Sequence, residues 1–81
     1  MQIRFERLCE VTRGNATSRT TVYADIAKGL FPRPVKIGVR AVAWPAHETE
    51  AVRAARLRGA SESELRELVA RLHAQRAGAG A

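Results

Sequence analysis

The stretch SRTTVYADIAKGLFPRPVKIG, residues 18–38, decides the fold, because it joins a helix, a helix stop and the start of a hairpin. Ser18 is a residue type that caps helix N-termini, and Thr17 beside it is a competing choice. Gly29 stands where a glycine accepts the left-handed conformation that ends many helices. The sequence therefore predicts a helix over Arg19–Lys28 that begins after Ser18.

A shorter helix is expected immediately upstream, over residues 8–14, where Leu8 and Val11 lie three positions apart. Gly14 and Asn15 then predict a turn, because both residue types tolerate a positive φ. The order of helix, turn and helix is that of the helix-turn-helix motif.

A basic hairpin is expected downstream of this unit. Phe31–Pro34 holds two prolines and is predicted to be a stiff, extended connector. Val35–Ile37 and Val42–Trp44 have the composition of short strands, joined by Gly38–Ala41. A two-stranded hairpin is marginal alone, so it must pack on the helices as a wing. Residues 1–6 also alternate apolar and polar side chains, which fits either a short strand or an extended arm.

Two further helices are predicted in the second half of the chain. Pro45 is suited to the first turn of a helix over residues 46–58. Ser61 and Glu64 match a capping box that opens a last helix over residues 62–76. Its apolar stripe either packs on the preceding helix or forms a homodimer surface, and consists of Leu65, Leu68, Val69 and Leu72.

The expected fold is mostly α: a winged helix-turn-helix with a small β-hairpin wing and an extra C-terminal helix. Residues 1–60 would form the DNA-binding unit. Residues 61–76 would form the C-terminal amphipathic helix, and residues 77–81, which carry no anchoring side chain, a disordered tail.

The charge is unevenly distributed. The chain has a formal net charge of +6, and residues 1–45 carry eight Lys and Arg against three acids, whereas residues 46–81 carry six against five. A polyanion-binding surface should therefore lie in the first half.

Other classes of protein are disfavoured by what the sequence contains. One cysteine allows no internal disulfide, two distant histidines provide no zinc spacing, and no apolar run is long enough for a membrane span. No nucleophile–base pattern or glycine-rich phosphate loop is present. We therefore expect a cytoplasmic, nucleoid-associated protein that is not an enzyme and uses no cofactor or metal, with double-stranded DNA as its partner. RNA is disfavoured because no exposed aromatic platform is apparent.

The candidate DNA-contacting residues begin on the first turns of the second helix. In a helix-turn-helix, these positions meet base edges and phosphates. Arginine can donate two hydrogen bonds to the edge of a guanine, and hydroxyls can donate hydrogen bonds to phosphate near a helix N-terminus. The alternative is an ordinary solvated helix face with Ser18 acting only as a cap. These candidates are Ser18, Arg19, Thr20, Thr21 and Tyr23.

Four more cations complete the candidate site. Lys28 and Arg33 would clamp the flanking DNA backbone, although Lys28 could equally complement the helix dipole and Arg33 could be a plain loop residue. Lys36 and Arg40 would act from the wing, where the alternative is protection of an edge strand by charge. Trp44 is favoured as a core anchor over a base-stacking role.

Several segments, in their order and spacing, resemble the AlpA family of regulators from phages and integrated elements, which is related to MerR-like winged-helix proteins and to excisionases. The segments are Leu8–Val11, Ser18–Tyr23, Lys28–Gly38 and Arg40–Trp44, with Glu48 beyond them. The resemblance implies a MerR-like fold and a DNA-binding transcriptional regulator, which activates an excision integrase gene or assists excision directly. It also implies the recognition-helix and wing roles given above.

The chain departs from the family pattern at two places. Asn15–Thr17 stand where the family usually has Thr-Gly-Leu, and Val52 and Arg53 replace a typical Trp-Ile pair. A second hypothesis is an excisionase-like architectural factor, or an adaptor that contacts an integrase or RNA polymerase through the last helix.

Overall fold

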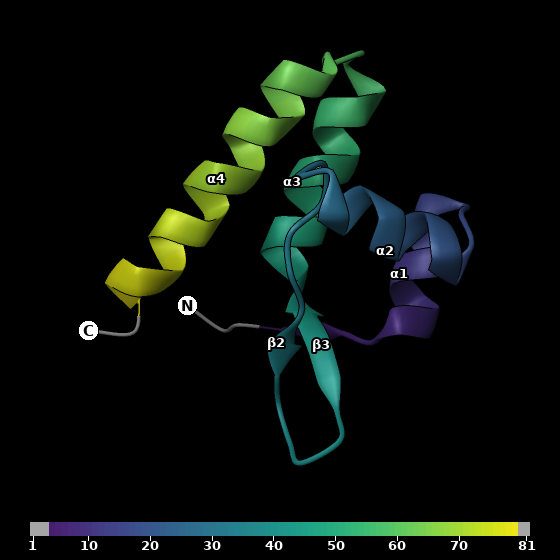
Figure 1. The fold of residues 1–81 in the computed structure, drawn as a ribbon, viewed down its shortest axis with the longest axis vertical. Helices are drawn as coiled ribbons and strands as arrows, with labels where there is room; N and C mark the ends of the chain where they lie inside the picture. Colours follow the sequence, from purple (N-terminus) through teal and green to yellow (C-terminus); the bar gives the residue numbers. More distant parts are fainter. Residues whose placement is uncertain (1–3, 80–81) are drawn as a thin grey trace.

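The computed structural model describes residues 4–79, which form four helices and three short strands (Figure 1). This mostly helical chain with a small antiparallel sheet is consistent with the expected winged helix-turn-helix. In chain order the elements are β1 (Phe5–Glu6), α1 (Leu8–Asn15), α2 (Arg19–Ala27), β2 (Val35–Lys36), β3 (Val42–Pro45), α3 (Ala46–Leu57) and α4 (Glu62–Ala79).

The small sheet joins the N-terminus of the chain to the wing. Strand β3 lies in the centre and pairs antiparallel with β1 on one side and β2 on the other. Glu6 is opposite Trp44, and Lys36 is opposite Val42. The described part of residues 1–6 therefore includes a strand. The loop between β2 and β3 projects away from the helices as the wing (Figure 1).

Trp44 anchors the wing in the core, as the sequence predicted. Its side chain is fully buried, and its ring packs edge-on against Phe31 with the ring centroids 6.0 Å apart. The indole Nε1 donates a hydrogen bond of 2.8 Å to the carbonyl of Pro32. The strand that leaves the wing is thereby fixed to the connector that enters it.

The turn between α1 and α2 differs from the prediction. Gly14 and Asn15 belong to α1, and the residue with positive φ is Ala16, at 54°. A Cβ atom on Gly14 would lie 2.6 Å from Nη1 of Arg53, so this glycine permits a close approach by a side chain instead of making the turn. The same Nη1 donates to Asn15 Oδ1 over 3.3 Å.

Helix α2 ends as expected. Lys28 is its C-cap and Gly29 follows with φ at 77°, the left-handed conformation that favours glycine. Val22 faces the core and is 2% exposed, while Ile26 one turn later is half-buried. The opposite face of α2 is left to solvent.

The capping box that opens α4 is confirmed. The Ser61 amide donates to Glu64 Oε1 over 3.1 Å, and the Glu64 amide donates to Ser61 Oγ over 3.3 Å. The hydrogen bond from the Ser61 amide, followed by that from the Ser61 hydroxyl, lowers the pKa of Glu64, and the charge of Arg58 adds to the effect.

The apolar stripe of α4 packs within the chain. Leu65, Val69 and Leu72 are buried in one core with α2, α3 and the connector, and Leu68 is half-buried beside them. Of the two alternatives for this stripe, the structure therefore has the intramolecular one, because a homodimer surface would need these side chains exposed.

The end of the chain differs in one detail. Helix α4 continues to Ala79, three residues past the expected end at Arg76, and residues 80–81 of the expected tail lie outside the described residues. Within residues 4–79, no helix combines the length and the apolar character that crossing a membrane requires.

Candidate nucleic-acid interface

The N-terminus of α2 is held in shape by Ser18. Its Oγ accepts a hydrogen bond from the Thr21 amide over 3.2 Å and lies 3.1 Å from Thr21 Oγ1. Ser18 is thus the N-cap, and Thr17 is not. Arg19, Thr20 and Thr21 are all exposed on the first turn that this cap organises. The cap and an open polar face coexist at the same helix end.

Arg19 and Tyr23 form a pair on the exposed face of α2. They lie four residues apart, and the Arg19 guanidinium carbon is 6.0 Å from the centroid of the Tyr23 ring. Tyr23 is 39% exposed. At this distance the guanidinium lies at the outer limit of a cation–π contact with the ring.

A shallow hollow lies between α2, the wing and the start of α1. It has a volume of about 420 Å³, and Arg19, Tyr23 and Arg40 all line it. The lining therefore joins residues from opposite ends of the predicted site into one surface. The complete set is Arg7, Leu8, Cys9, Arg19, Tyr23, Arg40 and Val42.

The remaining predicted residues lie outside this hollow. These six residues are exposed but are not among its lining residues: Ser18, Thr20, Thr21, Lys28, Arg33 and Lys36. Arg33 lies towards α4, since its charge acts on His73 and its backbone amide donates to His73 Nε2 over 3.1 Å. The structure thus brings together Arg19, Tyr23 and Arg40 and sets Arg33 apart from them.

The cations that line the hollow differ from those on α3 and α4 in their partners. In the part of the chain that the structure describes, no salt bridge involves Arg7, Arg19 or Arg40. On α3 and α4, by contrast, most arginines meet an acid. The pairs are Arg53–Glu6, Arg56–Asp25, Arg66–Glu62 and Arg76–Glu48. Three cations without a salt bridge in the described residues therefore line one hollow.

Sequence reasoning missed the contribution of α1 to this surface. Arg7 precedes α1, and its backbone amide donates to Glu10 Oε1 over 3.0 Å. Cys9 is exposed in the first turn of the helix. The only signal in the sequence was a basic residue at a helix start, since the neighbourhood of α1 and the wing depends on the pairing of β1 with β3.

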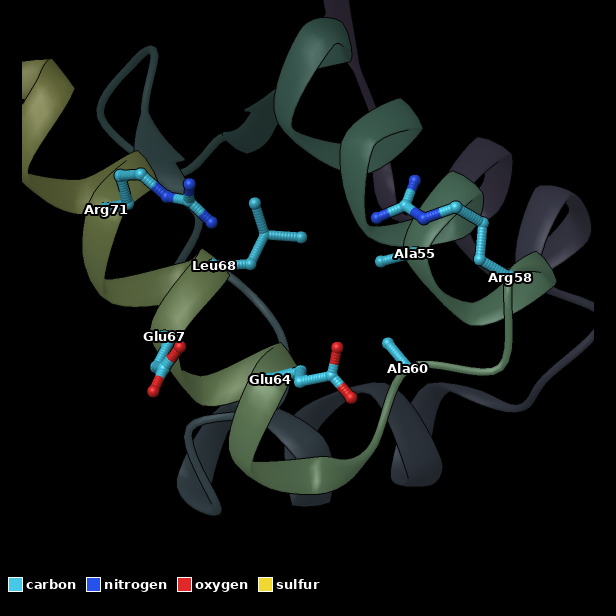
Figure 2. Close-up of a pocket in the computed structure, with 7 residues that line it drawn as sticks. All are labelled: Ala55, Arg58, Ala60, Glu64, Glu67, Leu68 and Arg71. Carbon is cyan, nitrogen blue, oxygen red and sulfur yellow. The ribbon is translucent and has the colours of Figure 1, made fainter.

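A second, smaller hollow lies between α3 and α4 and has a different character. It encloses about 130 Å³. Figure 2 shows Arg58 and Arg71 on its two sides, with the Glu64 carboxylate between the helices and Leu68 pointing inwards. Its acids and bases balance, so it lacks the excess positive charge that a polyanion requires.

No set of three or more His, Cys, Asp or Glu side chains within residues 4–79 is arranged to hold a metal ion. The imidazole of His73 on α4 has a shifted pKa. Burial, followed by the charges of Arg33 and Arg76, lowers its pKa below 6.5, against an opposing effect of Glu48.

Known proteins resemble this chain over the same region that builds the hollow. The family described as Prophage CP4-57 regulatory protein (AlpA) matches residues 4–57. An uncharacterized protein, ORF88 of Enterobacteria phage P4, is 43% identical over 58 residues, which cover 72% of this chain and 66% of that protein. No solved structure matches the chain. The family match spans more than half of the sequence, and the chain therefore belongs to the AlpA family of prophage regulatory proteins.

Proposed function

We propose that this protein is a sequence-specific regulator that binds double-stranded DNA, with residues 18–28 in the major groove and the wing, residues 35–44, on the backbone or the adjacent minor groove. One observation carries the proposal. Arg19 and Tyr23 of α2 and Arg40 of the wing line a single hollow whose cations have no acidic partner among residues 4–79. Membership of a prophage regulatory family supports the same conclusion.

Each residue has a role that its chemistry suits. Arg19, next to the Tyr23 ring, would donate two hydrogen bonds to O6 and N7 of a guanine. Ser18, Thr20 and Thr21 would contact phosphate at the positive end of the helix dipole. Arg40 would contact phosphate or enter the minor groove, and Arg7 would be a third cation on the same surface of the protein.

The protein would act by binding and not by catalysis, without a cofactor, in association with the nucleoid. One short helix and one wing bury little surface on DNA. Useful affinity would therefore come from tandem sites or from a second copy. Since most of the α4 stripe is buried, such a copy would use a surface other than Leu65, Val69 and Leu72.

The runner-up proposals have less support. An excisionase-like architectural role uses the same DNA surface and differs in how strongly the duplex is bent. An adaptor that contacts an integrase or polymerase through α4 would lack the apolar face of that helix, which the chain itself covers.

Selection of bound duplexes from a random pool, followed by gel shifts in rising salt, tests the proposal. Arg19→Ala should weaken specific binding by about 1–3 kcal/mol and relax the base preference at one position. Arg40→Ala should weaken all sequences alike and reduce the salt slope by about one unit. Arg71→Ala is the matched control, because it removes one exposed arginine from the second hollow.

The control should bind like the unmodified protein, apart from a small non-specific effect of net charge. Equal losses for Arg71→Ala and Arg19→Ala would show that the assigned surface is wrong. Failure of the random pool to yield any enriched motif would contradict sequence-specific binding.

A further inference from the structure

Helix α4 lies beyond the residues that the family covers, yet it holds the segment that links the recognition helix to the wing. We propose that α4 is a positioning element, which fixes the wing relative to α2 by binding the backbone of residues 28–33. The inference rests on the proposed function, because it explains how two halves of one DNA-binding surface keep their relative placement.

The connector needs partners from elsewhere in the chain. Pro32 and Pro34 have no N–H group, and the extended backbone between them forms neither a helix nor a ladder. Its remaining amides and carbonyls must therefore bond to side chains or to water. The Trp44 indole takes one of them, the Pro32 carbonyl.

Three side chains of α4 form hydrogen bonds with three further backbone groups of residues 28–33. Arg66 Nε donates to the carbonyl of Lys28, the C-cap of the recognition helix, over 3.0 Å. His73 Nε2 accepts from the Arg33 amide over 3.1 Å, and Arg76 Nη2 donates to the Arg33 carbonyl over 2.6 Å. The backbone is thus held both where α2 ends and just before β2 begins.

The three residues lie on one face of α4, because positions 66, 73 and 76 are separated by seven and three residues. The helix itself is fixed in turn. Arg76 donates to both oxygens of Glu48 on α3, over 2.9 and 2.5 Å, and Glu48 is 1% exposed. Leu65, Val69 and Leu72 pack in the core alongside. A helix that is fixed to the core therefore binds the connector from one side.

The hydrogen bonds from α4 to the connector bear on how the protein binds DNA. The hollow requires Arg40 of the wing to face Arg19 and Tyr23 of α2. If the connector were mobile, binding to DNA would have to order the wing. The entropic cost of this ordering would reduce the affinity that Arg40 contributes. If α4 holds the connector, the two contacts reinforce each other. Arg66 and His73 are therefore positioning residues that act through residues 28–33.

A double-mutant cycle tests this inference. Arg66→Met with His73→Phe keeps bulk and removes two of the three backbone bonds, leaving that of Arg76 to the Arg33 carbonyl. Arg66→Lys with His73→Gln keeps a donor and an acceptor and serves as the matched control. Arg40→Ala is introduced into each chain. Dissociation constants are measured with a random-sequence duplex pool, after thermal melting has shown that each chain is folded.

In the unmodified and control chains, Arg40→Ala should weaken binding by roughly tenfold, as expected for loss of a charge-assisted hydrogen bond. In the Arg66→Met/His73→Phe chain, the loss should be at least about twofold smaller, because only Arg76 of the three α4 side chains still binds the connector. Recovery of the full loss in the control would assign the effect to the backbone bonds and not to the packing of α4.

Two outcomes would overturn the inference in distinguishable ways. An equal loss of affinity from Arg40→Ala in the folded unmodified chain and in the folded Arg66→Met/His73→Phe chain would show that α4 does not position the wing. This outcome would leave the proposed function intact. No loss from Arg40→Ala in any chain would contradict the proposed function itself. If the double substitution prevents folding, the cycle is run with Arg66→Met alone, since the Arg66 side chain is 50% exposed and its removal opens no cavity.

Discussion

The guanidinium of Arg76 on α4 forms two hydrogen bonds with the carboxylate of Glu48 on α3, from Nε to Oε2 and from Nη2 to Oε1. Glu48 is almost completely buried, whereas the Arg76 side chain is 24% exposed. The pair therefore ties the last helix to the third at a point where water cannot replace a lost partner.

Removing the arginine should strongly destabilise the fold. Arg76→Met leaves the Glu48 carboxylate buried without its partner, so the free energy of unfolding should fall by roughly 3–5 kcal/mol in urea titrations. Glu62→Gln, which breaks the exposed Arg66–Glu62 pair, is the control and should lower it by no more than about 0.5 kcal/mol. Similar small losses for both variants would mean that the Glu48 pair behaves as a surface ion pair.

His73 should make the stability of the protein depend on pH. Burial and the charges of Arg33 and Arg76 lower its pKa in the folded state, so below pH 6.5 the unfolded chain takes up a proton that the folded chain resists. The free energy of unfolding should therefore be greatest above pH 6.5 and decline as the pH falls through and below that value. Protonation also removes the Nε2 lone pair that accepts from the Arg33 amide.

Urea unfolding at about pH 7.5 and pH 5.5 measures this decline. In His73→Gln, the amide oxygen can still accept from Arg33 but does not titrate. The decline between the two pH values should therefore be smaller in this variant. An unchanged decline would assign the pH dependence to other groups.

Cys9 provides a native probe of the hollow. It is exposed, it lines the hollow beside Arg19 and Arg40, and it is the chain's one cysteine, so a thiol reagent labels a single position. A bound duplex should slow the reaction of Cys9 with an uncharged maleimide in proportion to the bound fraction. Added salt, which releases the duplex, should restore the rate. Full reactivity under saturating duplex would place the DNA elsewhere.

The sequence predicted the elements whose signals are local. Ser18 and Gly29 delimit the recognition helix, Ser61 and Glu64 open the last helix, and Trp44 anchors the wing, all through residue types that act within a few positions or by bulk. These features follow from caps, glycine conformations and the burial of a large aromatic side chain.

It could not predict the contacts that depend on distant segments. Arg53 replaces an apolar residue of the family pattern, and the structure shows why this is tolerated: Nη2 binds both oxygens of the Glu6 carboxylate, over 3.2 and 3.0 Å. That pair forms only once β1 has joined β3. This strand pairing matches Phe5 with Pro45 and Glu6 with Trp44, and no local pattern predicts it. Local pattern places Gly14 in a turn for the same reason, because the contact between Gly14 and Arg53 depends on packing between distant segments.

The candidate site likewise combines residues that local patterns predict with contacts that depend on distant segments. A helix start predicts Arg19 and Tyr23, a hairpin predicts Arg40, and their meeting in one hollow is a result of packing. No local pattern predicts Arg7 and Cys9, since their side chains reach the hollow only through the placement of α1. The bonds from Arg66, His73 and Arg76 to the connector likewise had no signal beyond three polar residues on one helix.

The most direct test is a titration of isotope-labelled protein with duplex DNA, followed by backbone amide chemical shifts. The largest changes should cluster at residues 7–9, 18–23 and 38–42, which together surround the hollow, with little change around Arg58 and Arg71. Changes confined to the α3–α4 face, or absent from the wing while present on α2, would contradict the claim that the two elements form one DNA-binding surface.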